Sequence, residues 1–138
     1  MRRTVFLLGL TLVTGLAAGV LGDRRLDAQP APARVTELLR TDLAGMEGKE
    51  LIVQLVEVAP GAATGRHYHP GPEVAYVLDG SGLLEIDGRP PVPSKAGEVN
   101  YIPARQVHEG RNASPAAPLR LVVFRIHEKG QPVTVRVQ

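Results

Sequence analysis

The chain of 138 residues contains no cysteine and no tryptophan, and only 4% of its residues are aromatic. The absence of cysteine excludes disulfide bridges, thiolate-bound zinc, iron–sulfur clusters and cysteine nucleophiles. Any bound metal must therefore be held by nitrogen and oxygen atoms. The sequence also lacks a Gly-x-Ser-x-Gly elbow, a phosphate-binding loop and a dinucleotide fingerprint, which argues against serine hydrolases, nucleotidases and Rossmann enzymes. Its 43% hydrophobic and 22% charged residues are typical of one globular domain.

The excess of positive charge lies at the start of the chain. Met1-Arg2-Arg3 precedes an uncharged apolar stretch over residues 4–22, and small residues follow near a cleavage site expected after Ala28. This layout predicts a signal peptide over residues 1–28. An uncleaved membrane anchor is the alternative, because about 20 apolar residues suffice to span a bilayer. Either interpretation predicts export from a bacterial cell, to the periplasm or the exterior, with membrane contact only through an uncleaved N-terminal segment.

Without residues 1–28 the chain is neutral. Four of its 16 basic residues and two of its 14 acidic ones lie in that segment, so that 12 of each remain. A neutral domain lacks the basic surface that binds phosphate backbones, and we therefore expect no nucleic-acid partner.

Beyond the signal segment the sequence predicts an all-β domain. Residues 29–48 are expected to form a proline-containing linker and an N-terminal segment with one helical turn over residues 36–40. A barrel is expected over residues 49–138. Its predicted strands span residues 51–59, 73–78, 83–86, 99–102, 107–111, 119–126 and 133–137. Such short strands, separated by Gly, Pro, Asn and Asp turns, indicate a β-sandwich or β-barrel.

Three of the four histidines form a pattern that predicts a metal site. In His67-Tyr68-His69 the two imidazoles flank one residue, and because side chains of a strand alternate, both rings point to the same face. Glu73 follows after the turn Pro70-Gly71-Pro72, which can return the chain so that its carboxylate joins the pair. His108 lies after the Pro103 turn and can complete the set from another strand.

The spacing of these residues resembles the two motifs of the cupin family. The first motif is matched at Gly61, His67, His69, Glu73 and Gly80. The second is matched at Gly97, Pro103, His108 and Asn112, with Arg105 in place of the usual glycine. The resemblance implies a double-stranded β-helix, a jelly-roll barrel that holds one metal ion at one end through His67, His69, Glu73 and His108.

Three imidazoles and one carboxylate suit a divalent Fe, Mn, Ni, Co, Cu or Zn ion, and the sequence does not choose among them. A six-coordinate ion would keep open positions for a small-molecule ligand or substrate. We therefore expect a metalloenzyme acting on a small organic substrate, with oxidation of the dioxygenase type favoured and isomerase, lyase or decarboxylase activity left open. A metal-dependent binding or sensing module without turnover is the alternative.

The surroundings of the metal site and the outer surface carry further expectations. Candidate residues for the pocket or for contacts behind the ligands are Asn112, Tyr101, Gln54 and Arg66. Tyr76 has the parity of the outer face, and His127 is expected to be a solvated histidine at a strand end. Residues 51–59 and 119–126 are apolar on both faces, so one of these faces must be covered, either by a second copy of the chain or by residues 35–50, and we favour the second copy. The sequence therefore predicts a homodimer with an isologous interface.

Overall fold

A computed structural model describes residues 31–138, and the predicted signal peptide lies outside the described residues. The described part contains ten strands and no helix. The strands are β1 (Ala33–Asp42), β2 (Lys49–Val58), β3 (His67–Tyr68), β4 (Glu73–Asp79), β5 (Ser81–Ile86), β6 (Val92–Lys95), β7 (Val99–Ile102), β8 (His108–Asn112), β9 (Leu119–Glu128) and β10 (Val135–Arg136). No helix long and apolar enough to cross a bilayer occurs in residues 31–138. The all-β prediction is confirmed.

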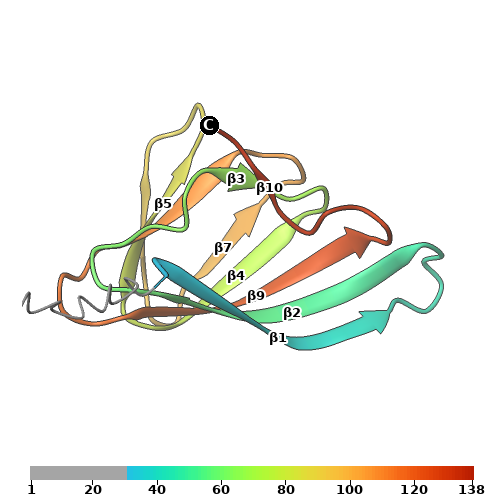
Figure 1. Ribbon diagram of the computed structural model, residues 1–138, viewed down its shortest axis with the longest axis horizontal. Coiled ribbons are helices and arrows are strands. Elements are labelled where there is room, and N and C mark those ends of the chain that lie inside the picture. Colours follow the sequence, from blue (N-terminus) through green and yellow to red (C-terminus); the bar gives the residue numbers. More distant parts are fainter. Residues whose placement is uncertain (1–30) are drawn as a thin grey trace, which may run out of the picture.

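The strands form two antiparallel five-stranded sheets that face each other. The order is β1-β2-β9-β4-β7 in the first sheet and β10-β3-β8-β5-β6 in the second. Figure 1 shows β1, β2 and β9 side by side in one sheet, while β5, β3 and β10 lie across from them. Apart from the consecutive pairs β1–β2 and β5–β6, neighbouring strands are not consecutive in the chain, as in a double-stranded β-helix.

Alternation along the strands separates a buried interior from the outer surface. On β4, Glu73, Ala75 and Val77 are buried, whereas Val74 and Tyr76 are exposed. Tyr76 therefore lies on the outer face, as its parity predicts. The apolar part of the interior is a cluster of Val56, Val58, Ala75, Val77, Ile102, Leu119 and Val123. All of these residues except Val58 line a cavity between the sheets, so the cluster forms the walls of that cavity.

The predicted helical turn over residues 36–40 is wrong. These residues belong to β1, which pairs with β2 from Ala33 opposite Val58 to Asp42 opposite Glu50, with a bulge between Glu37 and Leu39. The ladder of backbone hydrogen bonds to β2 outweighs the helix propensity of Glu-Leu-Leu-Arg, which is a run of good helix formers but too short to form a stable helix by itself. The sheet consequently includes residues 33–42 as well as the predicted barrel strands.

Candidate metal centre

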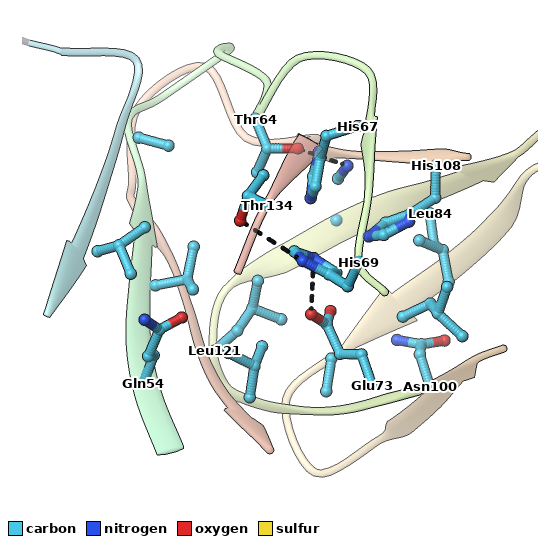
Figure 2. Close-up of a pocket in the computed structure, with 18 of the residues that line it drawn as sticks. Gln54, Thr64, His67, His69, Glu73, Leu84, Asn100, His108, Leu121 and Thr134 are labelled. Atoms are coloured by element: carbon cyan, nitrogen blue, oxygen red, sulfur yellow. Dashed lines mark hydrogen bonds and ion pairs between the residues drawn. The ribbon is translucent and has the colours of Figure 1, made fainter. Parts of the chain in front are cut away.

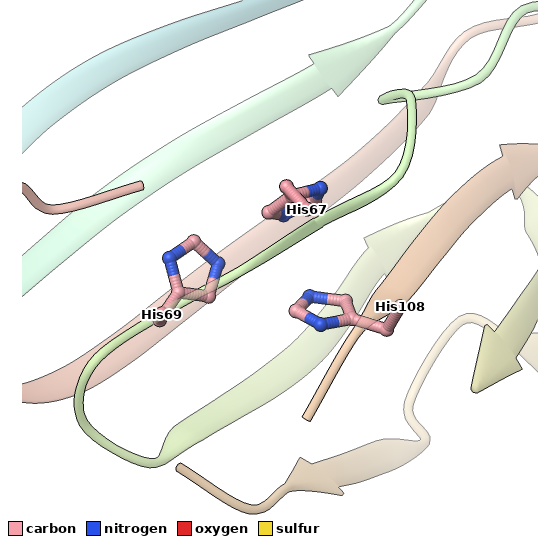
Figure 3. Close-up of side chains that lie close together, drawn as sticks. All are labelled: His67, His69 and His108. Carbon is pink, nitrogen blue, oxygen red and sulfur yellow. The ribbon is translucent and has the colours of Figure 1, made fainter. Parts of the chain in front are cut away.

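Three buried imidazoles meet inside one end of the barrel. His67 on β3 is the cross-strand partner of His108 on β8, and His69 follows two residues later on the same face. The ring centroids are 4.4 Å apart for His67 and His108, 4.8 Å for His67 and His69, and 5.3 Å for His69 and His108. One nitrogen from each ring lies within 4.8 Å of the other two. Figure 3 shows the three rings facing a common point.

Backbone carbonyls hold all three rings through the same nitrogen. The Nδ1 atoms lie at hydrogen-bond distance from carbonyl oxygens, 2.7 Å for His67 and Gly65, 2.7 Å for His69 and Val133, and 2.9 Å for His108 and Gln106. A carbonyl only accepts, so each Nδ1–H donates and each Nε2 keeps a free lone pair. This pattern is the one that supports histidines bound to a metal.

One of these nitrogens has no hydrogen-bond partner. His69 Nε2 is buried and lies 3.1 Å from Glu73 Oε2. Two acceptors at this separation do not stabilise each other, but ligand atoms about 2.0–2.2 Å from one metal ion lie about 3 Å apart when they are adjacent in an octahedron. The orphaned nitrogen and this spacing both fit a divalent ion.

Glu73 is shared between the histidines and a buried arginine. Arg125 on β9 is its cross-strand partner and donates from Nε at 2.6 Å and from Nη2 at 2.5 Å, both to Oε2. A third donor, Nη1, reaches the side-chain oxygen of Gln54 on β2. The contacts to Arg125 and His69 all use Oε2, so a metal ion bound beside His69 Nε2 would share this oxygen with the guanidinium. Glu73 lies outside the group of three histidines, and its role as a ligand stays a prediction.

Burial and charge set the protonation of the centre. Burial alone would raise the pKa of Glu73, but the adjacent His69 imidazole and the Arg125 guanidinium lower it to about 2. Burial lowers the pKa of His67 to about 4, and it also lowers the pKa of His108. At neutral pH the centre therefore presents an ionised carboxylate and, at His67 and His108, neutral imidazoles able to bind a metal.

The centre opens into a cavity of about 330 Å³ between the two sheets. Figure 2 shows His67, His69 and His108 around one part of it, with Glu73 beside His69. Apolar side chains line the rest, among them Val56, Val77, Leu84, Leu119 and Leu121. Thr134, in the segment before β10, lies at the histidine end, where its hydroxyl is 3.5 Å from His69 Nδ1. The volume is at the lower end of the range of small-molecule sites.

Of the four candidates behind the ligands, only Gln54 lines this cavity. Asn112 is buried, but its amide donates to the carbonyls of Val58, Ala59 and Ala117, so it fixes the chain rather than the site. Tyr101 is 61% exposed because it occupies an outward position of β7. Arg66 turns outward to form an ion pair with Asp87, at 2.5 Å.

One other expectation is corrected by the structure, and one departure from the motif is explained. His127 was expected to be solvated but is only 2% exposed, because it has the inward parity of β9, and its Nε2 bonds the Gln131 carbonyl at 3.0 Å. Arg105 has φ of +62°, a conformation in which glycine is favoured, which explains the glycine usual at this position. Its N–H donates to the His69 carbonyl at 2.8 Å, which ties this turn to the ligand segment.

Sequence reasoning missed Arg125, although a signal was present. On β9 the inward positions Leu119, Leu121 and Val123 are apolar, and Arg125 continues the same parity. A lone charge in an inward register position requires a buried partner. That requirement points to a carboxylate within the barrel.

Comparison with known proteins agrees with this geometry. A family model described as "Cupin domain" matches residues 54–125. The dimethylsulfoniopropionate lyase DddW of Ruegeria pomeroyi is 36% identical over 78 residues, which are 55% of this chain and 50% of the lyase. The chain thus spans about half the length of that relative.

Two solved structures share the fold. A conserved protein with a double-stranded β-helix domain from Klebsiella pneumoniae has a TM-score of 0.61 at 19% identity, over 80% of this chain and 90% of that one. An oxalate oxidase, solved with the substrate analogue glycolate, has a TM-score of 0.61 at 27% identity, over 80% of this chain and 57% of that one. The predicted double-stranded β-helix is confirmed.

Proposed function

Because the chain belongs to the cupin family, as the match over residues 54–125 shows, we propose that it is a metalloenzyme acting on a small organic molecule. One divalent transition metal ion is held by His67, His69 and His108, with Glu73 as the fourth ligand. The observation that carries this proposal is the set of three Nδ1–carbonyl hydrogen bonds, which leave three Nε2 lone pairs directed to one place. The lyase and oxidase relatives are enzymes with small organic substrates, which supports the same class.

Oxidation by molecular oxygen is the reaction favoured by the cavity. A lyase or isomerase needs a side chain that takes a proton from the substrate. Among the described residues that line the cavity, the titratable groups are the three histidines, Glu73, Arg125 and Arg136. The low pKa of Glu73 and its ion pair with Arg125 make it a weak base. Oxidation asks less of the side chains, because a bound ion with open positions supplies the reactive centre.

The other residues of the site orient the metal-binding side chains and exclude water from the cavity. The carbonyls of Gly65, Val133 and Gln106 fix the tautomer and direction of each imidazole. Arg125 keeps Glu73 ionised and in place. The apolar walls exclude water from the remainder of the cavity, which strengthens electrostatic interactions at the histidine end.

The test is oxygen consumption by the protein loaded with Fe(II) under anaerobic conditions and then mixed with air-saturated buffer and a panel of small organic acids and alcohols. Uptake that requires both iron and one substrate, and that His108→Ala abolishes, would support an oxygenase. Product formation without oxygen would instead indicate a lyase or isomerase. Tight binding of a panel member without turnover would favour the binding or sensing module.

Export and pairing are further parts of the proposal. The signal-like residues 1–28 support a periplasmic or extracellular location. The outer face of β4, β7 and β9 supports a homodimer, because it exposes seven apolar or aromatic side chains: Val74, Tyr76, Leu78, Val99, Tyr101, Phe124 and Ile126. The exposed charges of these strands, Asp79, Arg120 and Glu128, lie at strand ends. Residues 29–138 carry equal numbers of basic and acidic groups, so two copies meet without net repulsion.

A further inference from the structure

The cavity changes from polar to apolar along the inner face of the first sheet. Three cross-strand pairs follow one another there: Arg125 with Glu73, Val123 with Ala75, and Leu121 with Val77. Arg125 and Leu121 are four residues apart on one strand, a span of about 13 Å. The histidine end of the cavity is therefore well separated from an end that is entirely apolar on this sheet.

The second sheet shows a similar gradient. His108 on β8 lies at the polar end, and the next inward position of the same strand is Gly110, which pairs with Leu84 on β5. A side chain at Gly110 would meet only Thr64, at 3.7 Å, so the glycine leaves room beside the histidines. Leu84 then faces the cavity from the same side as Gly110. The space next to the metal site thus leads directly to apolar walls.

The few polar groups away from the histidines are already bonded. Asn100 donates its amide to the Ser94 hydroxyl at 2.8 Å. Both residues line the cavity, and this pair satisfies part of their bonding capacity. A polyhydroxylated ligand such as a sugar would bury several hydroxyl groups against valine and leucine without partners, which is costly.

The charge of the cavity favours an anion. Among its described lining residues the charged side chains are Glu73, Arg125 and Arg136. Glu73 and Arg125 neutralise each other in their ion pair. Arg136 on β10, the partner of His67 in the ladder, is exposed and donates to the Thr64 carbonyl, so its positive charge lies at the solvent edge of the histidine end. A divalent ion would add two more, so the polar end attracts negative charge.

We propose that the cavity binds a small amphiphilic anion, with a carboxylate head at the histidine and arginine end and an apolar tail along Val77, Leu119 and Leu121. This inference rests on the proposed metal centre and adds the chemical class of its ligand. Burial of each tail methylene against these walls contributes to affinity, whereas the head sets the requirement for negative charge.

The experiment is calorimetric titration of the full chain, loaded with one equivalent of zinc, with straight-chain carboxylates from acetate to octanoate. We expect the Kd to fall about fourfold for each added methylene, until the chain exceeds the cavity. Hexanol and hexylammonium should bind at least about tenfold more weakly than hexanoate. In the cobalt-loaded protein, hexanoate should also change the visible absorption, which reports on the head group at the metal.

A pair of variants on β9 locates the tail. Leu121→Phe fills part of the apolar end, so its strongest ligand should be shorter than that of the unchanged protein. Val122→Phe, on the next residue and the opposite face, should leave the preferred length unchanged. A Kd that does not depend on chain length, or equal affinity for hexylammonium and hexanoate, overturns the inference while leaving the metal centre intact. Failure to bind one equivalent of zinc overturns the metal centre, and the proposed ligand with it.

Discussion

Replacing Arg125 by methionine should destabilise the protein more than any surface charge change. Arg125 and Glu73 side chains are each 7% exposed, and Arg125 donates twice to Glu73 and once to Gln54. Arg125→Met leaves a buried carboxylate without its counter-charge. Removing one partner of a buried ion pair costs about 3–5 kcal/mol of the free energy of unfolding. The loss should shrink as the pH falls, because burial then raises the pKa of the unpaired Glu73 and a proton neutralises it.

The measurement is urea unfolding of the chelator-treated protein at pH 7.5 and pH 5, followed by circular dichroism. The double variant Glu73→Gln/Arg125→Met should recover most of the loss, since no buried charge is then left unpaired. Arg120→Met is the matched control on the same strand, because Arg120 is 43% exposed and pairs with Glu57 at 3.5 Å, and its change should stay within about 1 kcal/mol. A loss below about 1 kcal/mol for Arg125→Met, or a double variant as unstable as the single one, would refute the reasoning.

Three further predictions concern acid stability, metal binding and assembly. The pKa of His67 is about 4 in the folded protein and about 6.5 in the unfolded chain, so the unfolded state binds a proton first as the pH falls. The metal-free protein should therefore lose about 3 kcal/mol of its free energy of unfolding between pH 6.5 and 4. In urea titrations across this range, the His67→Gln variant should lose less. His108→Ala should weaken zinc binding by more than about 100-fold in chelator competition, because even loss of a group behind a ligand costs 10–100-fold; unchanged affinity would contradict the site. If the chain forms the proposed homodimer, Phe124→Glu should convert it to a monomer in light scattering, whereas Val92→Glu, 44% exposed on the other sheet, should not. A single monomer mass for the unchanged protein at all concentrations would rule out the proposed dimer.

Most strands were predictable because local pattern and tertiary structure agree there. The run over residues 51–59 is β-branched and apolar, and β2 occupies Lys49–Val58; the prediction over residues 99–102 coincides with β7. Residues 33–42 were not predictable in this way, because nearly every side chain of β1 is exposed and no alternation appears in its sequence. Its conformation comes from pairing with β2, a tertiary interaction that propensity does not report.

The candidate site was likewise predictable only where a local pattern fixes the face of a side chain. The His67-Tyr68-His69 spacing fixes the face of two imidazoles within one short segment, and the structure brings His108 to them. Pocket residues chosen for nearness in sequence mostly failed, since Tyr101 lies in an outward register position and Arg66 bonds outside the cavity. Nearness along a strand carries no information about the face, whereas parity does.

The contact between Arg125 and Glu73 depends on the register between two strands and on nothing local in the sequence. It lies 52 residues after Glu73, and only the pairing of β4 with β9 makes the two side chains neighbours. Their ion pair changes the chemistry that the histidine motif alone suggests. With the Glu73 carboxylate balanced by a guanidinium, the chain neutralises little of the charge of a divalent ion. Such a centre retains affinity for an anionic ligand, and this is the physical link between the buried ion pair and the carboxylate that we propose as its ligand.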